Sequence, residues 1–445
     1  MSGGLRERLS RLTKSGSGAG NIEGRGASER ESALTEAPIL TEAPVPDVPS
    51  SGALALDPEA EAWGRLGFAT VEGPQGACFV RDVRYGADYR HGRFAVADLA
   101  EAGAALSRLD PAGRAIDPSR LLFLDTETTG LGQGAGNVPF LIGVGWWDAS
   151  GFTVRQYAIR HPGEEAAMLA MLAELLPSYT HLVTYNGRTF DWPLVKNRYV
   201  MHRMSIPKDP SHFDFLYPSR SLWRTTMPSC RLGAVEEAKL GVFREDDVPG
   251  SMAPALYFQY LAERDASVLA GVFRHNETDI VTLMALAVHF GKLLGGGVDY
   301  DALTSAELLR LGLWYERLGF EAEAREAIAA LAARPAAESR AQLEEAAQFY
   351  KRRKLWSEAV RLWRALVEEG RDGRFGSLEP YVELAMAYEH RLKDADEALY
   401  WTDAAQRSAE ARLSLARAGD RKLRELLQDI RKRKERLAKK CRTRS

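Results

Sequence analysis

Short apolar runs that end in polar or turn-forming residues predict a set of strands in the first two thirds of the chain. The clearest run is LLFL, which starts at Leu121, leads into two acidic residues and ends at Gly130. Four apolar residues in a row are few for a helix and fit a buried central strand. Similar runs, two of them joined as a hairpin by a DASG turn, predict strands over residues 121–130, 137–148, 152–160 and 181–187.

Apolar residues at helical spacing predict helices between and after these strands. Residues 164–176 show this spacing and carry acidic residues in the first turn, where the helix dipole favours them. The same spacing predicts helices over residues 191–203 and 274–290. Adjacent strands, a crossover helix and a further strand predict an α/β sheet whose functional groups gather at strand ends.

From about Ser305 the chain is rich in alanine, reads as helical and repeats itself. Small and aromatic residues recur at matching places in residues 308–331, 343–366 and, more loosely, 381–405. The small residues let paired helices approach, and Tyr and Trp fill the gaps between stacked copies. The pattern resembles tetratricopeptide repeats. That resemblance implies an all-α repeat domain over residues 303–440 that holds a protein partner; a plain helical bundle is the alternative.

Length and composition divide the rest of the chain. With 445 residues and a hydrophobic fraction of 45%, two or three packed units are expected. Residues 1–57 predict a short amphipathic helix over residues 5–13 followed by a disordered linker of Gly, Ser, Glu, Ala and Pro. In residues 58–117 apolar and polar residues alternate between turn residues, and this pattern predicts a small β-rich lead-in. The α/β domain is expected over residues 118–295.

Cysteine content and charge bear on location and partners. The three cysteines lie far apart and form neither a disulfide framework nor a zinc pattern, which favours a reducing, cytoplasmic setting. No segment approaches about 18 uninterrupted apolar residues, so no membrane association is expected. The net charge of −2 favours no class of partner. The basic stretch of residues 431–445 could contact phosphate or form a solvated helix end.

Acidic residues stand at the ends of the predicted elements. Asp125 and Glu127 are two apart in extended backbone and project to the same side. Carboxylates aimed at one point repel each other unless a cation such as Mg²⁺ or Mn²⁺ lies between them. Asp191 opens one predicted helix, and His275 and Asp279 share a face of another. Each also has an ordinary structural explanation, as a capped turn, a helix N-cap or a His–Asp hydrogen bond.

Taken together, the three motifs resemble a known family. Asp125-Thr-Glu127, Asp191 within YNGxxFD and Asp279 within HNxxD resemble the exonuclease motifs of the DEDD superfamily. Residues 213–223 and 231–250, together with the HNETDI segment, are similar to its YprB-type ribonuclease H-like branch. The resemblance covers residues 118–292. It implies an RNase H-like mixed sheet with flanking helices and a 3′→5′ exonuclease activity.

The resemblance also implies the chemistry of the site. Its two divalent metal ions, Mg²⁺ or Mn²⁺, are assigned to Asp125, Glu127, Asp191 and Asp279. Such a pair activates a water and stabilises the departing oxygen of a phosphodiester. An imidazole suits the general base near neutral pH, and His275 is predicted in that role although it stands where one subgroup has Tyr. The predicted substrate-binding residues are Thr126, Thr128 and Asn186.

The sequence therefore predicts a metal-dependent nuclease acting on DNA or RNA. The alternative is a non-catalytic nucleic-acid-binding protein of the same fold, recruited through its helical repeats; the presence of all four acids disfavours it. Arg220 and Arg224 could contact phosphate or belong to a solvated basic face. Asp246 and Asp247 are expected in a surface loop. Asp214 could lie near the site, although a structural role is expected for it.

Overall fold

The structure is a computed structural model that describes residues 58–130, 136–205, 208–369, 377–415 and 421–442. The predicted N-terminal helix and linker lie outside these residues. Contacts divide the chain into two compact units, Leu54–Ala327 and the helical remainder that begins at Ile328. Within the described residues, no helix combines the length and the apolar character needed to cross a membrane.

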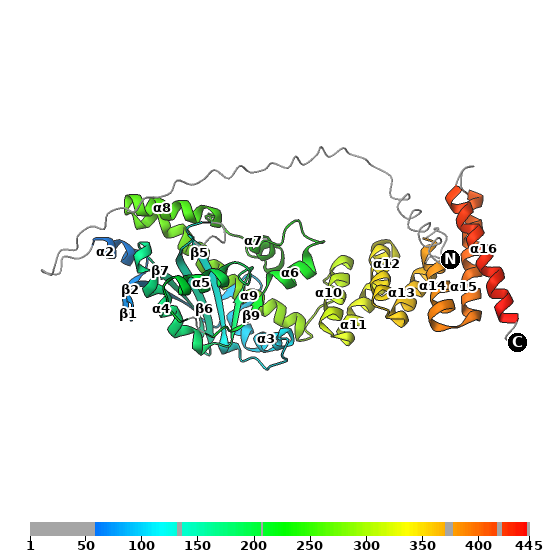
Figure 1. Ribbon diagram of the computed structural model, residues 1–445, viewed down its shortest axis with the longest axis horizontal. Helices are drawn as coiled ribbons and strands as arrows, with labels where there is room; N and C mark the ends of the chain where they lie inside the picture. Colours follow the sequence, from blue (N-terminus) through cyan, green and yellow to red (C-terminus); the bar gives the residue numbers. More distant parts are fainter. Residues whose placement is uncertain (1–57, 131–135, 206–207, 370–376, 416–420, 443–445) are drawn as a thin grey trace. The chain divides into compact units, whose positions relative to one another are not determined.

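The first unit is built on a seven-stranded mixed sheet flanked by helices (Figure 1). In spatial order its strands are β1 (Ala69–Gly73), β2 (Gly76–Tyr85), β7 (Gly151–Ala158), β6 (Pro139–Asp148), β5 (Leu121–Thr128), β8 (His181–Thr184) and β9 (Ser211–Asp214). Neighbours from β1 to β5 run antiparallel, whereas β5, β8 and β9 run parallel. The C-terminal ends of β5 and β8 therefore lie at the same edge of the sheet.

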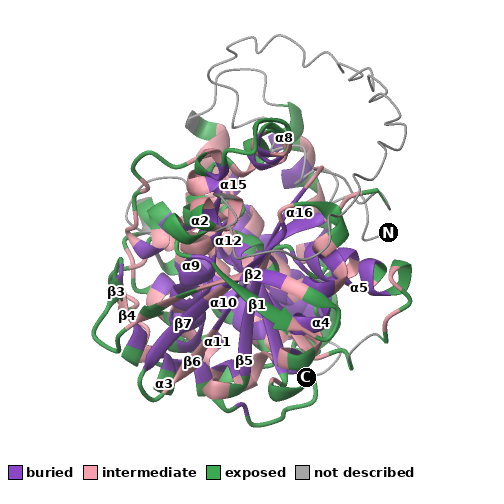
Figure 2. Ribbon diagram, turned by 90° about the vertical axis from the view of Figure 1, so that its left-hand side faces the viewer, coloured by how far each residue is buried: buried purple, intermediate pink, exposed green. Residues whose placement is uncertain are grey.

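Both faces of β5 are buried, because alternate side chains of a strand point to opposite sides. Phe123 packs in one hydrophobic cluster with α9 (Ala270–Leu294). Leu122 and Leu124 pack in a second cluster on the other face. That second cluster is formed with α4 (Glu165–Leu175), α5 (Asp191–Met201) and α8 (Ala253–Glu263). Figure 2 shows the inner strands as buried and β1 as an exposed edge.

The α/β fold with a mixed sheet is confirmed, and the predicted strands and helices of the sheet region are all present. Their ends differ from the prediction by a few residues, as for α9, which is longer at both ends than the predicted 274–290. β9 was not predicted, because its four residues, SHFD, contain no apolar run. It forms a strand because it pairs with β8.

Elements on both sides of this region join the same unit. Residues 58–117 supply α2 (Pro58–Arg65), β1 and β2, which extend the sheet at β7, and α3 (Leu99–Ala105), which packs on α9. α10 (Ser305–Leu318) also packs here: Tyr315 joins the cluster of Phe123 and its hydroxyl donates to the carbonyl of Leu293 at 2.5 Å. The division between the two units falls inside α11 (Glu321–Ala332).

The second unit is helical throughout its described residues. Its helices are α12 (Ala336–Arg352), α13 (Trp356–Glu369), α14 (Glu379–Ala387), α15 (Ala395–Leu415) and α16 (Arg421–Arg442). Each packs against the next in chain order. The small and aromatic residues of the predicted repeats are buried, among them Ala346, Tyr350, Ala359, Trp363 and Ala398. This packing is compatible with a repeat architecture, and the assignment to tetratricopeptide repeats stays a prediction.

Candidate active site

The candidate acids come from three elements that meet at the C-terminal end of β5. Asp125 is paired with Gly143 of β6. Glu127 lies two residues on, at an irregularity in the register where β5 ends. Asp191 is the first residue of α5, which follows β8, the parallel neighbour of β5. Asp279 lies on α9, which covers β5 and β6.

The four carboxyl groups influence one another, which places them in one cluster. Burial raises the pKa of Asp125 well above its usual range, and the charges of Asp279, Asp191 and Glu127 raise it further. The pKa of Glu127 is likewise raised by burial and then by Asp279 and Asp191. Burial raises the pKa of Asp191 to about 6. A group of carboxylates that oppose each other's ionisation calls for a compensating cation.

Three of the four acids, Asp125, Asp191 and Asp279, accept a hydrogen bond from a protein side chain. Asn276 Nδ2 donates to Asp125 Oδ2 at 2.9 Å, and the hydroxyl of Thr126 donates to Asp191 Oδ1 at 2.5 Å. Arg244 Nη2 donates to Asp279 Oδ1 at 2.5 Å. The hydroxyl of Thr126, predicted to contact substrate, thus orients a neighbouring acid. Thr128, also predicted to contact substrate, donates instead to the carbonyl of Gly130 at 2.7 Å.

The four acids suit a hard divalent cation as metal ligands, since they offer carboxylate oxygens and no cysteine. In the present arrangement, however, one oxygen each of Asp125, Asp191 and Asp279 accepts from a protein donor. Among the described residues, no three or more His, Cys, Asp or Glu side chains are arranged to ligate one metal ion. Holding a metal would therefore require some of these side chains to rotate, and first of all Asp279 to separate from Arg244.

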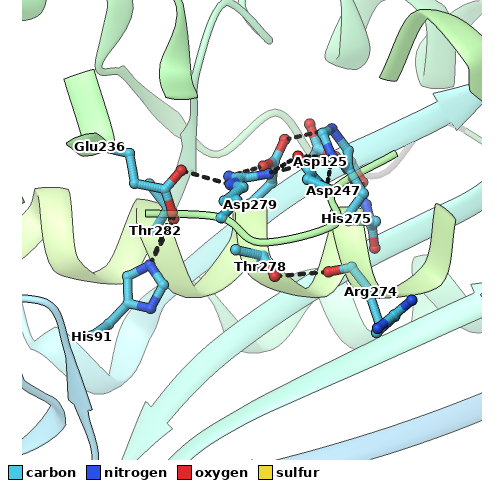
Figure 3. Close-up of polar contacts among 11 residues, drawn as sticks. His91, Asp125, Glu236, Asp247, Arg274, His275, Thr278, Asp279 and Thr282 are labelled. Carbon is cyan, nitrogen blue, oxygen red and sulfur yellow. Dashed lines mark hydrogen bonds and ion pairs between the residues drawn. The ribbon is translucent and has the colours of Figure 1, made fainter. Parts of the chain in front are cut away.

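His275 lies beside this cluster and is oriented by a residue of the preceding loop (Figure 3). Its Nδ1 is 2.8 Å from Asp247 Oδ1, and its Nε2 is 3.7 Å from Asp279 Oδ2. Arg244 Nη1 also lies 3.3 Å from this Nδ1. An Nδ1 proton donated to Asp247 would leave Nε2 with a lone pair that can accept one. Gly250 leaves space beside Nε2: a Cβ at that glycine would lie 3.2 Å from it.

Arg244 links the cluster to a buried acid behind it. Besides Asp279, its guanidinium contacts Glu236 Oε2 at 2.7 Å and Asp247 Oδ2 at 3.3 Å. Glu236 also accepts from the hydroxyl of Thr282 at 2.6 Å and lies 3.2 Å from His91 Nε2. Although burial raises the pKa of Glu236, these partners keep it below its ordinary value.

Asn276 connects Asp125 to a polar network under the sheet. Its Oδ1 accepts from Gln156 Nε2 at 2.9 Å, and Arg81 Nη1 in turn donates to Gln156 Oε1 at 2.8 Å. Asn276 is fully buried and reaches β6 only because residue 143 is a glycine, where a Cβ would lie 2.1 Å from its Oδ1. The network orients Asp125 from behind, through its Oδ2.

Sequence reasoning brought forward the acids and His275 but missed the residues that orient them. Asp247 lies in the predicted surface loop and is exposed, yet it bonds to His275. Arg244 and Asn276 were not singled out. The one local signal was the charged run of residues 244–247, which directly precedes a turn. Asp214 is structural, as expected: its carboxylate accepts from the backbone N–H of Asn186 at 2.7 Å.

With EDTA present, the protein is expected to lose stability as the pH rises through the range in which Asp191 titrates. A carboxyl whose pKa is raised by folding stabilises the folded state below its unfolded value, and this contribution is lost as the pH passes the folded value. For Asp191 this pH window runs from 3.8 to about 6, and the contribution to the free energy of unfolding that is lost across it is ~3 kcal/mol. Urea unfolding at a series of pH values measures it. Asp191→Asn should flatten the slope, and an unchanged slope would contradict the expectation.

Two comparisons with known proteins show what this chain is similar to. Residues 122–290 match the family described as the RNase_H superfamily. Over 351 residues the chain is 33% identical to the uncharacterized protein YprB of Bacillus subtilis (strain 168). That alignment covers 77% of this chain and 83% of YprB. The matched family region contains every candidate acid and His275.

Proposed function

This chain belongs to the family of YprB and carries an RNase H-like domain, and from that premise we propose that it is a metal-dependent 3′→5′ exonuclease. RNase H-like domains are generally nucleases and generally use divalent metal ions. The observation that carries the proposal is the cluster of Asp125, Glu127, Asp191 and Asp279. These acids come from three different elements of the fold, and the charges of Asp191 and Asp279 raise the pKa values of the other two. The 3′→5′ polarity rests on the resemblance to the DEDD superfamily.

The four acids would hold two divalent ions, Mg²⁺ or Mn²⁺. When bound, such ions lower the pKa of a water and neutralise the charge that develops on the departing oxygen. Asn276 and Thr126 orient Asp125 and Asp191 through the hydrogen bonds given above. His275 accepts the proton of the attacking water at Nε2, and Asp247 holds the ring in the tautomer that leaves this atom free.

His275→Ala is expected to lower kcat by ~10²-fold to 10⁴-fold with little change in KM, because a general base acts on the chemical step. Asp247→Asn should give a smaller loss and shift the pH profile, since it orients the base without touching substrate. Steady-state hydrolysis of a labelled oligonucleotide measures both. His161, a half-exposed histidine at the surface, supplies the control His161→Ala. Full activity of the His275 variant would remove it from this role.

One observation favours the alternative, a nucleic-acid-binding protein without cleavage. The ion pair between Arg244 and Asp279 occupies an oxygen that a metal would use. A protein that binds without cutting would keep this pair in every state. The two functions differ in whether divalent ions bring about hydrolysis, so the comparison of activity with Mg²⁺, with Mn²⁺ and with EDTA separates them.

Matched DNA and RNA strands, labelled at either the 5′ or the 3′ end, test polarity and sugar preference together. A 3′→5′ exonuclease releases single nucleotides from a 3′-labelled strand at once and yields a ladder from a 5′-labelled one. Equal inertness of wild type and Asp125→Asn on every substrate would overturn the nuclease and favour the binding function.

We also propose that the second unit recruits a protein partner and that the protein acts in the cytoplasm. The helices of that unit support the first of these through their repeat-like packing. Some basic residues of α16 are paired: Arg431, Lys434 and Arg436 form ion pairs with Glu410, Asp403 and Glu389.

A further inference from the structure

A basic hollow lies beside the second acidic motif, and the proposed chemistry does not use it. It has a volume of about 650 Å³ and is lined by the end of β8 and by the segment from α6 (Leu216–Trp223) to α7 (Leu232–Val235). Its lining residues include Arg220, Arg224 and Arg231, and none of them is acidic. Three arginines therefore line one space, and no acidic residue lines it.

The three arginines differ from most others of this unit. Arg81, Arg198 and Arg244 each form an ion pair with an acidic side chain. Arg220, Arg224 and Arg231 are exposed, and within the described part of the chain no acidic partner lies within ion-pair distance of them. Their charge reaches the walls of the hollow, where Arg220 and Arg224 oppose the burial-driven rise in the pKa of Cys230.

Hydrogen bonds fix the side of the hollow that Tyr185 and Asn186 of the second acidic motif line. The hydroxyl of Tyr185 donates to the carbonyl of Cys230 at 2.7 Å and so ties the end of β8 to the arginine-bearing segment. Asn186 is exposed and has a left-handed backbone with φ of 69°, a conformation that Asn tolerates better than most residues. Asp214 holds it there through the backbone hydrogen bond described above.

This side of the hollow adjoins the candidate acids. The turn that contains Asn186 leads directly into α5, and the N–H of Trp192 bonds to the carbonyl of Gly187 at 2.9 Å. Asp191, the first residue of α5, thus follows Asn186 of the hollow's wall by five positions in the chain. A strand whose end reaches the acids could extend toward the hollow along this turn.

We propose that this hollow binds the sugar–phosphate backbone of the nucleic-acid strand that is cut, on the side of the strand away from the cleaved end. Arginine is suited to this because its planar guanidinium donates two parallel hydrogen bonds to phosphate oxygens. Leu216, Met227 and Leu232 supply apolar wall against which a sugar or base can pack. The proposal rests on the proposed nuclease function, since it assigns the substrate contacts of that site.

The test is binding of short fluorescein-labelled single strands of DNA and of RNA to the full chain in EDTA, followed by anisotropy over a series of salt concentrations. For the combined variant Arg220→Gln, Arg224→Gln and Arg231→Gln, the slope of log K against log salt should fall by about 0.7 per lost contact, ~2 in all. The dissociation constant at low salt should rise by ~10-fold or more. Lysine at the same three positions should restore most of the slope.

Arg203→Gln is the matched control. Arg203 is exposed and lies two residues beyond Met201, the last residue of the 11-residue helix α5, whose length separates it from Asp191 by roughly 15 Å. Its removal should leave the slope unchanged. Thermal melts of every variant verify that the fold is kept.

The outcomes separate this proposal from the nuclease function. If the wild type cleaves and the triple variant binds and cleaves as it does, the hollow is not the substrate path and the nuclease stands. If the triple variant loses binding while the wild type binds but never cleaves, the hollow stands and the nuclease falls. A wild type that binds neither DNA nor RNA overturns both.

Discussion

Asp125→Asn is expected to lower the rate of phosphodiester hydrolysis by ~10³-fold or more, because it removes a proposed ligand whose ion contributes several kcal/mol to the transition state. The variant should stay folded. The asparagine has the shape of the aspartate, and its carbonyl can still accept from Asn276 Nδ2. Because Asp125 is buried among three other acids, removing its charge should also raise the melting temperature in EDTA.

Two measurements check this expectation. Activity is compared across wild type, Asp125→Asn and the surface control Asp82→Asn, whose carboxylate pairs with Arg155 and is 46% exposed. The melting temperature is measured with and without Mn²⁺, and the gain on adding the ion should shrink in the Asp125 variant. A variant that keeps wild-type activity, or that gains as much stability from Mn²⁺ as the wild type, would contradict the assigned ligand.

Arg244→Ala is expected to destabilise the first unit by ~3–5 kcal/mol, because removing one partner of a buried ion pair leaves the other charge uncompensated. The side chain of Arg244 is 14% exposed, and the Glu236 carboxylate it contacts is 1% exposed. Asp279 loses its cation at the same time and returns to a cluster of like charges. For a domain of this size the loss corresponds to a fall of ~6 °C or more in the melting temperature.

Calorimetry in EDTA at neutral pH measures this loss. Arg65→Ala supplies the control, since Arg65 and Glu61 form an i,i+4 pair with both side chains more than half exposed. Such pairs contribute ~0.3–0.5 kcal/mol, so the control should melt almost with the wild type. If both variants lose equally little, Arg244 does not compensate the acids in the folded protein, and the picture of a cation held at Asp279 fails.

The elements of the sheet were predictable because their signals are local. The four adjacent apolar residues Leu121–Leu124 predict a strand. The spacing of the apolar residues over Glu165–Leu175 predicts a helix, and each such signal spans one or two helical turns. Strand β9 escaped prediction because nothing in its own four residues favours a strand. Its conformation follows from pairing with β8, which is a property of the assembled sheet.

The site divides in the same way. Asp125, Glu127, Asp191, Asp279 and His275 lie within three short motifs, each of which has an ordinary structural explanation, and they were recognised because the three motifs together resemble a family. Asp247, Arg244 and Asn276 could not be recognised in this way, because their importance lies in partners far along the chain. Asn276 matters only because it reaches Asp125 across a glycine of β6, 133 positions before it in the sequence, at the place where that glycine leaves room.

Residue order and local periodicity thus sufficed for most strands and helices and for the α/β class of the fold, since each depends on neighbours within a few residues. The candidate acids stay a prediction that rests on the resemblance of three motifs taken together. The partners of His275, the cation facing Asp279 and the arginines around one hollow, which lack an acidic partner among the described residues, depend on side chains that the folded backbone brings together. Such contacts arise from packing over long sequence separations, and no pattern within a short window of residues encodes them.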